Sequence, residues 1–344
     1  MKLNLGVLAF ALVFPMTGLA QTAAKCKFVR DPTIPISASG TWCLTASIVG
    51  RGLLIDADDV VLDLRGYSII NDGTATTPVV YLGTEVAGVL AENHNNITVR
   101  NGTIRGFDYG VQLGFPGGAR GNVLVENLLV LNSKARGINV LVYDTVTVRN
   151  NTVSGVAGRS IYGISARGRN DVVNNLPNLS VLIIQNNRVH DVHGNVTTGA
   201  HLSAGIAAWS GNDTVISGNV VTDTFHDSAS SQISGIDVRN EFPQTSLISG
   251  NVLLNSHVDR NTFGVGSSQH MGTPAYTGPI EIFGNITGNR VYNFDTGVTA
   301  SASINENGKP KFVITSIVGQ NVSSGARAGR AFMGGQQYPT NRIE

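Results

Sequence analysis

The sequence predicts an all-β protein wound as a right-handed parallel β-helix with three short strands in each coil. Glycine followed by Ile or Val returns along the chain, and a β-type run interrupted by asparagine returns in phase with it. No stretch of the body shows helical periodicity with capping residues. Because internal repeats take precedence over chain length, the 344 residues predict one elongated unit.

The glycine marker sets the length of a coil. It occurs at Gly88, Gly110, Gly137, Gly163, Gly205, Gly235, Gly264 and Gly297. The shortest step, from Gly88 to Gly110, is 22 residues, and the longer steps carry insertions. The residue after each glycine is expected inside the coil, which predicts an internal stack of Ile138, Ile164, Ile206 and Ile236.

The asparagine marker predicts the corners between strands. It occurs in runs such as VTVRNNTV, LIIQNNRV and SLISGNVL, in which apolar residues alternate on both sides of the asparagine. This alternation points one face of each strand inward, and asparagine tolerates the left-handed backbone conformation that a tight corner needs. Each repeat therefore holds one strand after the glycine and two strands around the asparagine.

This three-strand repeat resembles the pectate-lyase-like superfamily of large-coil β-helices over roughly Asp56 to Ser323. The resemblance implies that the asparagine corner lies between the second and third strands and that aligned asparagines form a ladder. The stretch WCLTASIVGRGLLIDADDVVLDLRGYSII is also similar to the opening of many exported bacterial β-helix proteins. For function, the resemblance implies a substrate groove over the outer face of the first-strand sheet.

Both ends of the chain lie outside this repeat. Residues 1–20 have an early lysine, the apolar run Leu5 to Phe14 and a small-residue cleavage site, which together predict a secretory signal. Residues 21–55 form an N-terminal segment in which Cys26 and Cys43 are expected to pair, because an exported protein meets an oxidising compartment. We predict the β-helix over 56–324 and a tail or cap over 325–344.

The charge balance excludes two classes of partner. Without Lys2 the 24 basic residues become 23, equal to the 23 acidic residues. Such a balance gives no long-range attraction to nucleic acid or anionic lipid. No apolar stretch after the signal is long enough to span a bilayer. We therefore expect neither nucleic acid nor a membrane as partner, and the oligomeric state is left open.

Outward positions on the first strands supply the first candidate site. Counting from the glycines puts Arg167, Trp209 and Arg239 in one outward column on successive coils, with Asp237 in the neighbouring column. Coils lie about 4.8 Å apart, so the two arginines are expected roughly 10 Å apart. The indole could support a sugar ring while the guanidinium groups pair with uronate carboxylates. The alternative is a structural cation–π stack.

Loops before three consecutive first strands supply the second candidate site. Six of the seven histidines lie in or just beyond these loops, and Asp191 and Asp223 share one register with His193 two residues after the first. The triplet Asp191-Val192-His193 resembles the D-P-H-D motif of β-helix mannuronan epimerases. The resemblance implies a catalytic histidine at His193, although Val192 and Gly194 depart from the motif.

These sites predict an exported carbohydrate-active protein that removes the C5 proton of a uronate residue, as a lyase or an epimerase. The expected catalytic residues are Arg239, His193, Arg167 and Asp191. The expected substrate-binding residues are Trp209, Asp237, Asp223, His226, His257 and Asp259. An enzyme of this kind must neutralise the carboxylate and place a base near the proton.

Four alternatives stay open. The chain could bind glycan or act as a scaffold without catalysis, or Asp237 and Asp223 could hydrolyse a glycosidic bond. No cofactor is required, but Asp191, Asp223 and Asp237 could supply oxygen ligands to calcium. The histidine loops could also bind copper.

Overall fold

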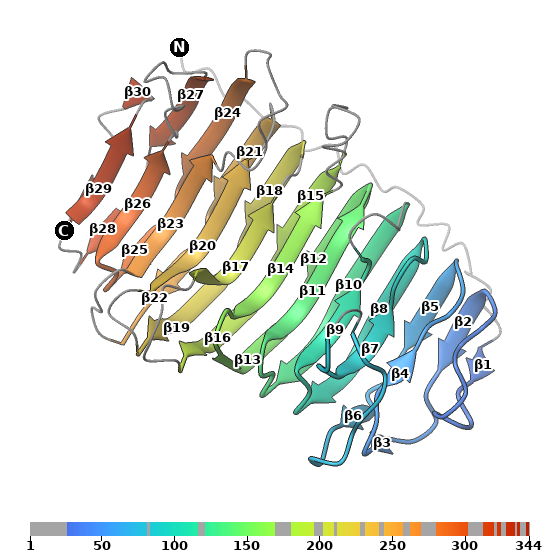
Figure 1. Ribbon diagram of the computed structural model, residues 1–344. Helices are drawn as coiled ribbons and strands as arrows, with labels where there is room; N and C mark the ends of the chain where they lie inside the picture. The colour runs from blue at the N-terminus through green and yellow to red at the C-terminus, as the bar shows by residue number, and fades with distance from the viewer. Residues whose placement is uncertain are drawn as a thin grey trace, which may run out of the picture.

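The computed structural model describes residues 26–343, except 81–82, 116–120, 169–179, 196–201, 210–211, 228–230, 241–243, 257–261, 270–279, 302–311, 320–321, 325–327, 334–335 and 338–341. The described residues form strands and no helix, and all pairings between the named strands are parallel. The strands lie side by side in chain order from one end of the stack to the other (Figure 1). This arrangement confirms the predicted all-β parallel β-helix.

The first strands of the coils form one ten-stranded sheet, the first-strand sheet. Its members in spatial order are β4 (Leu53–Leu54), β7 (Ala87–Ala91), β9 (Tyr109–Leu113), β11 (Arg136–Tyr143), β14 (Tyr162–Gly168), β17 (Leu202–Trp209), β20 (Gln232–Asn240), β23 (Thr262–Gln269), β26 (Thr296–Ser301) and β29 (Ala328–Met333). Each strand pairs with the first strand of the next coil, so a residue faces its equivalent one coil away.

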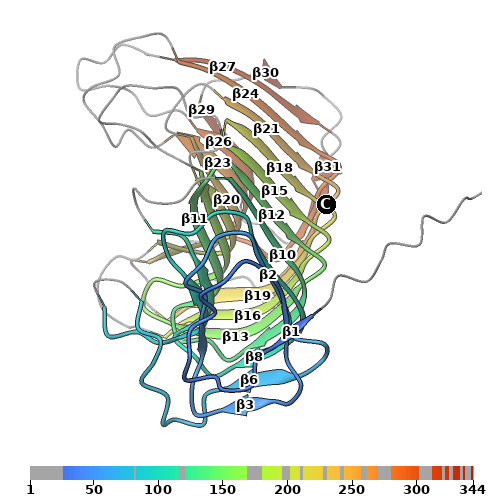
Figure 2. The same cartoon turned by 90° about the vertical axis from the view of Figure 1, so that its right-hand side faces the viewer.

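The second and third strands occupy the other two sides of the stack (Figure 2). The second-strand positions are taken by β1 (Lys27–Phe28), β2 (Gly40–Cys43), β5 (Val60–Asp63), β12 (Thr145–Arg149), β15 (Val181–Gln185), β18 (Asp213–Ser217), β21 (Gln244–Ser249), β24 (Ile280–Thr287), β27 (Phe312–Gly319) and β30 (Gln336–Gln337). The third-strand positions are taken by β3 (Ile48–Val49), β6 (Ser68–Ile70), β13 (Thr152–Gly158), β16 (Arg188–Gly194), β19 (Val220–His226), β22 (Val252–Leu254), β25 (Arg290–Tyr292), β28 (Val322–Ser324) and β31 (Arg342–Ile343).

Two strands run through the corner and join these two sides into one 21-stranded sheet. They are β8 (Ile97–Arg105) and β10 (Asn122–Leu131). Asn101 and Asn127 bend them with φ of 61° and 54°, so the backbone turns without leaving the sheet. The three sides of the stack are therefore built from two hydrogen-bonded sheets.

The core is the predicted stack of aliphatic side chains. Ile138, Ile164, Ile206 and Ile236 lie in register on β11, β14, β17 and β20, and none is exposed to solvent. The glycine before each is required for space rather than for an unusual φ. A Cβ on Gly137 would collide with the Val153 side chain of the third strand and with the carbonyl oxygen of Gly163. The first and third strands thus approach closely only at glycine.

The predicted asparagine ladder is present. Its members are Asn151, Asn187, Asn219, Asn251 and Asn289, all at most 1% exposed. Each Nδ2 donates to Oδ1 of the next member at 2.9 to 3.0 Å. The left-handed conformation belongs to the residue before each member, namely Asn150, Asn186, Gly218, Gly250 and Gly288. The corner therefore needs Asn or Gly for its backbone and then Asn for its side chain.

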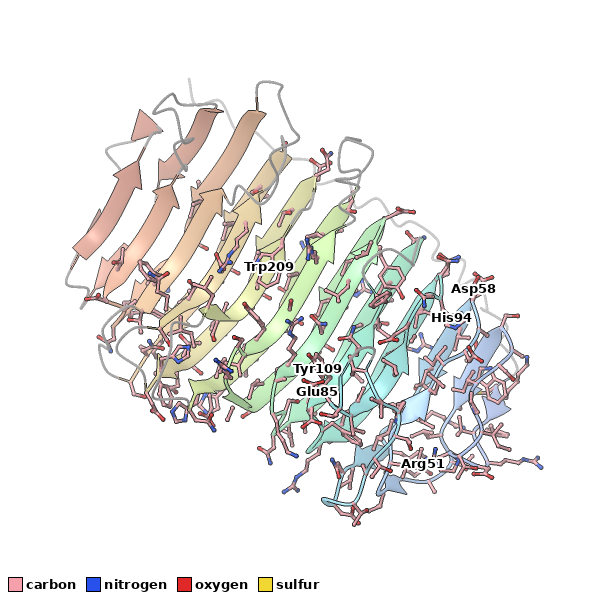
Figure 3. All side chains as sticks on the ribbon, viewed as in Figure 1. Arg51, Asp58, Glu85, His94, Tyr109 and Trp209 are labelled. Atoms are coloured by element: carbon pink, nitrogen blue, oxygen red, sulfur yellow. A yellow bond between two sulfur atoms is a disulfide. The ribbon has the colours of Figure 1, made fainter. Side chains whose placement is uncertain are left out.

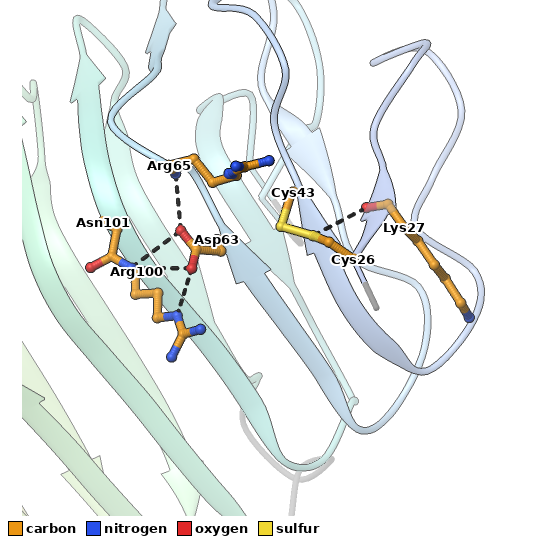
Figure 4. The surroundings of a disulfide bond; sticks show 7 residues. All are labelled: Cys26, Lys27, Cys43, Asp63, Arg65, Arg100 and Asn101. Atoms are coloured by element: carbon orange, nitrogen blue, oxygen red, sulfur yellow. Dashed lines mark hydrogen bonds and ion pairs between the residues drawn. A yellow bond between two sulfur atoms is a disulfide. The ribbon is translucent and has the colours of Figure 1, made fainter. Parts of the chain in front are cut away.

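The N-terminal end carries the predicted disulfide between Cys26 and Cys43, whose Cα atoms are 5.9 Å apart (Figure 4). The bond ties β1 to β2, where Phe28 pairs with Cys43. Parallel pairing joins Gly40 to Val60 in this segment. At the other end of the solenoid, β29 pairs with β26 and β31 pairs with β28, beyond residue 324. Parallel pairing is thus present in the N-terminal segment and after residue 324 as well as in the repeats.

Candidate functional site

The predicted outward columns are present on the first-strand sheet. Arg167, Trp209 and Arg239 face one another in register on β14, β17 and β20. In the neighbouring column Ala207 faces Asp237. The structure therefore brings together four residues that the sequence placed on this face, and Figure 3 shows Trp209 near the middle of the stack.

Arg239 lies between an aromatic ring and a carboxylate. Its Cζ is 5.4 Å from the centre of the Trp209 ring, and its Nε donates to Asp237 Oδ2 at 2.7 Å. The side chains of Arg239 and Asp237 are only 18% and 9% exposed, so this ion pair is largely removed from water. The guanidinium is consequently held in a fixed orientation over the indole.

A third outward column, which the sequence reasoning missed, continues the site. It consists of Tyr109, Arg136 and Tyr162, in register on β9, β11 and β14. Arg136 Cζ lies 5.8 Å from the Tyr109 ring centre and 5.2 Å from that of Tyr162. The available signal was the residue before each glycine, in YGVQL, RGINV and YGISA. The prediction from the sequence assigns outward positions only to residues that follow each glycine, so it misses this column.

Tyr162 joins this column to Trp209. The two rings meet edge to face with centres 5.1 Å apart. Tyr162 is 4% exposed and its hydroxyl donates to the carbonyl oxygen of Leu202 at 3.0 Å. Burial raises the pKa of Tyr162 above its usual value, while Arg239 and Arg136 act to lower that pKa. We call Tyr109, Arg136, Tyr162, Trp209, Asp237 and Arg239 the outer-face cluster.

Polar side chains lie between the outer-face cluster and the sheet. Asn139 accepts from Arg136 Nη1 at 2.8 Å and donates to Gln112, which donates to the Gly114 carbonyl oxygen. Ser165 follows in the same column and is fully buried. Ser165 Oγ and Trp209 Nε1 are buried and have no hydrogen-bond partner within the described part of the chain.

Three of the described histidines form a second group at the corner that leads into the first strands. His193 Nε2 lies 2.7 Å from Asp227 Oδ1, and its ring stacks on Phe225 with centres 4.2 Å apart. His190 Nδ1 lies 3.4 Å from Asp223 Oδ2. We call His190, His193, His226, Asp223 and Asp227 the histidine corner; they come from β16, β19 and the residue that follows β19.

One backbone segment links the histidine corner to the outer-face cluster. His226 Nε2 lies 3.1 Å from Ser203 Oγ, and the preceding residue, Leu202, accepts the hydrogen bond from Tyr162. The contacts of His193 are with Asp227 and Phe225, whereas those of Arg239 are with Asp237 and Trp209. The predicted catalytic pair of Arg239 and His193 is thus divided between two neighbouring groups, and its role stays a prediction.

Asp191 and Asp223 share the register expected from the asparagine corner. Both have left-handed backbone conformations, with φ of 55° and 53°, which short polar side chains tolerate. Asp223 Oδ1 also accepts a hydrogen bond from the Ser256 amide at 2.9 Å. The left-handed backbone gives both aspartates a conformational role at the corner. The other two predicted binding residues, His257 and Asp259, lie outside the described residues.

The seventh histidine lies apart from both groups, near the N-terminal end (Figure 3). The two ring nitrogens of His94 are each 3.2 Å from a carboxylate oxygen, one of Asp56 and one of Asp58. Within the described ranges no three His, Cys, Asp or Glu side chains are grouped to hold a metal ion. The described part of the chain also contains no helix with the length and hydropathy needed to cross a bilayer.

Comparison with known proteins gives one structural likeness. No protein-family model matches the chain, and no curated protein matches it. Among solved structures, the chain is similar to the A-module of the mannuronan C-5 epimerase AlgE4 from Azotobacter vinelandii. The two are 13% identical, the match covers 89% of each chain, and the TM-score is 0.29. A TM-score this low does not place residues of one chain on residues of the other.

Proposed function

We infer that this chain is an exported carbohydrate-active protein that binds a uronate-containing polysaccharide across the outer-face cluster. The observation that carries this proposal is the continuous layer of rings and guanidinium groups formed by Tyr109, Arg136, Tyr162, Trp209 and Arg239. Aromatic faces pack against the apolar faces of sugar rings, and guanidinium groups pair with carboxylates. A polymer that crosses successive coils would meet both.

The charges of this layer favour an acidic polymer. Arg136, Arg167 and Arg239 supply three cations on neighbouring strands, and Asp237 is the carboxylate of the outer-face cluster. Binding of an anion to partly buried donors is stronger than binding to exposed ones, because water screens them less.

The reaction proposed at this site is transfer of the C5 proton of a uronate. Arg239, helped by Arg167, would stabilise the negative charge that develops on the carboxylate as the proton leaves. His193 would accept the proton, with Asp227 orienting its ring and stabilising the imidazolium that forms. Asp191, Asp223 and His226 would border the substrate at the histidine corner. If the glycosidic C4–O bond then breaks and the leaving oxygen takes a proton from His193 or water, the product is that of a lyase; if water delivers a proton to the opposite face of C5, the product is that of an epimerase.

A second function is favoured by one observation. His193 is engaged by Asp227 and Phe225 rather than by a member of the outer-face cluster. The same surface could therefore bind polysaccharide without altering it, as a glycan-binding or scaffold protein. Export is part of either proposal, and the Cys26–Cys43 disulfide supports it because such bonds persist in oxidising compartments.

The test is incubation of the purified protein with alginate, polygalacturonate, chondroitin and neutral dextran. Binding is measured by calorimetry, lyase activity by the ultraviolet absorbance of unsaturated products, and epimerase activity by deuterium uptake from solvent. Adding calcium or a chelator decides whether calcium takes part. Binding with neither absorbance nor exchange would establish the non-catalytic function, and no binding to any acidic polymer would exclude both.

A further inference from the structure

Arg136 differs from other arginines of the solenoid in its partners. Arg100, Arg149 and Arg239 each form an ion pair with a carboxylate, at 3.0, 2.7 and 2.7 Å, and Figure 4 shows the first pair with Asp63. Within the described residues, no carboxylate lies within ion-pairing distance of Arg136. Its contacts are the two tyrosine rings and the carboxamide oxygen of Asn139.

The hydrogen-bond count of Arg136 is correspondingly incomplete. A guanidinium carries five N–H donors, and the contact with Asn139 uses one of them. The chain from Asn139 through Gln112 to the Gly114 carbonyl oxygen fixes the group that holds Arg136. The rings of Tyr109 and Tyr162 flank the guanidinium from the two neighbouring coils, and four of its N–H groups have no hydrogen-bond partner within the described residues.

We propose that Arg136, flanked by Tyr109 and Tyr162, is an anion subsite that binds one oxyanion substituent of the polysaccharide in a bidentate manner. The proposal rests on the proposed function and deepens it. A planar fork between two rings is pre-organised for a carboxylate or a sulfate ester, which present two oxygens at matching spacing. The partner Asn139 is neutral, in contrast to Asp237, which balances the charge of Arg239.

The position of the subsite sets its relation to Trp209. Arg136 is on β11 and Trp209 is on β17, two coils further along the sheet, which is about 10 Å along the axis. One polymer chain could therefore place a charged substituent on Arg136 and a ring on Trp209 at the same time. The anion on Arg136 would fix the register of the polymer over the rest of the outer-face cluster.

The experiment is a double-mutant cycle between the arginine and the charge on the ligand. Wild type, Arg136→Gln and Arg136→Lys are titrated with polygalacturonate and with its methyl ester, which removes the charge and keeps the backbone. Chondroitin and chondroitin sulfate form the second pair, which separates a carboxylate from a sulfate. Arg105→Gln, an exposed arginine at the end of β8, is the matched control for loss of one positive charge.

The expected result is a loss of affinity of about tenfold to a hundredfold for the acidic polymer in Arg136→Gln. A smaller loss is expected in Arg136→Lys, which keeps the charge and the side-chain stem but not the fork. The methyl ester should bind wild type and Arg136→Gln equally, and Arg105→Gln should bind like wild type. Thermal unfolding and circular dichroism establish that each variant is folded.

Three results overturn the subsite in distinguishable ways. If wild type binds an acidic polymer and both Arg136→Gln and Arg136→Lys bind it as tightly as wild type does, the subsite is excluded and the proposed function stands. Equal losses for the acid and its ester exclude it as well, because the arginine would then act through packing. If wild type binds no acidic polymer of either pair, the proposed function fails and the subsite fails with it.

Discussion

In the outer-face cluster, the ion pair between Arg239 and Asp237 affects both the stability of the fold and the affinity for an anion. Arg239 and Asp237 are mostly buried, and a buried ion pair offsets its desolvation only when its geometry is good and its remaining hydrogen bonds are satisfied. The pair holds Arg239 over Trp209, which prepares the guanidinium for a ligand while reducing its net charge. Stability and anion affinity therefore oppose each other at this pair.

Asp237→Asn should separate these two effects. Asparagine keeps the shape but removes the charge opposite Arg239, so the free energy of unfolding should fall by about 1 to 3 kcal/mol. The affinity for an acidic polysaccharide should rise or hold, because the guanidinium is no longer balanced. Urea unfolding and calorimetric binding measure the two quantities, and a fall in affinity would argue that Asp237 itself contacts the sugar.

Trp209→Ala and His193→Ala test the two groups of the site separately. Removing the indole should weaken polysaccharide binding more than it slows turnover, because the ring supports bound sugar in both the ground state and the transition state. His193→Ala should leave binding nearly intact and lower turnover by about a hundredfold or more. Initial rates and calorimetric Kd values decide this. Unchanged activity in the histidine variant would remove His193 from the proposed mechanism.

Buried tyrosines should make the fold sensitive to alkali. Burial raises the pKa of both Tyr143 and Tyr162 above the value of 10.0 of an exposed phenol. Since the folded state holds these phenols neutral, their contribution to stability is complete below about pH 10 and is lost as the pH rises above it. The free energy of unfolding measured in urea should therefore fall above pH 10. The fall should be less steep in Tyr143→Phe and in Tyr162→Phe. Tyr67→Phe, an exposed tyrosine, should match wild type.

Within the elements, the corners depend on single polar side chains in an apolar interior. Asn219 accepts hydrogen bonds from the Asn187 backbone and side chain and donates to the Ile184 carbonyl oxygen. All these groups are buried, so they have no water to replace a lost partner. One ladder asparagine therefore satisfies the backbone of the coil before it.

Asn219→Ala should lower the free energy of unfolding by about 3 kcal/mol or more, because it leaves a buried backbone donor and a buried acceptor without partners. Urea denaturation measures the loss. The control is Asn122→Ala, which removes an exposed asparagine from β10 and should change stability by less than about 0.5 kcal/mol. Equal effects in the two variants would mean that the ladder is not a major source of stability.

Much of this organisation could be predicted from particular positions in the sequence. The period-two alternation after each glycine placed Ile206 inside and Trp209 outside, because side-chain direction in a strand depends only on parity. The left-handed corner was assigned to asparagine in general, whereas the structure divides it between Asn186 for the backbone and Asn187 for the side chain. Both roles use the same residue type, so composition could not separate them.

The outer-face cluster was only half predictable. The column containing Arg167, Trp209 and Arg239 followed from counting within one strand. The contact between Tyr162 and Trp209 joins residues on both sides of the glycine corner and depends on how two large side chains lean. Repeat spacing determines neither how the chain bends at the corner nor which rotamer a side chain adopts. For the same reason it could not predict the ion pair between His193 and Asp227.

Across the whole molecule, each coil contacts mainly its two neighbours, so stability is expected to be local. The disulfide lies at the N-terminal end, where β1 pairs with β2. The outer-face cluster lies on β9 to β20, several coils away. Damage at the end should therefore leave the site intact.

Replacing Cys26 and Cys43 by serine should destabilise the first coils by roughly 3 kcal/mol, the loop-closure estimate for a crosslink of this length. Hydrogen exchange should increase in β1, β2 and β5, while exchange in β14 and β17 and the affinity for polysaccharide stay unchanged. Alkylation of the unreduced wild type should find no free thiol. Faster exchange throughout the solenoid would show that the coils unfold as one unit.

The asparagine ladder also has a direction. Each carboxamide oxygen accepts from the coil before it, and each amide group donates to the oxygen of the coil after it. The dipoles of these side chains therefore share one orientation along the axis and add, whereas the backbone N–H and C=O groups of each strand point alternately up and down the axis and largely cancel. The row gives the solenoid an electrical polarity, positive toward its C-terminal coils, which does not depend on the distribution of charged residues.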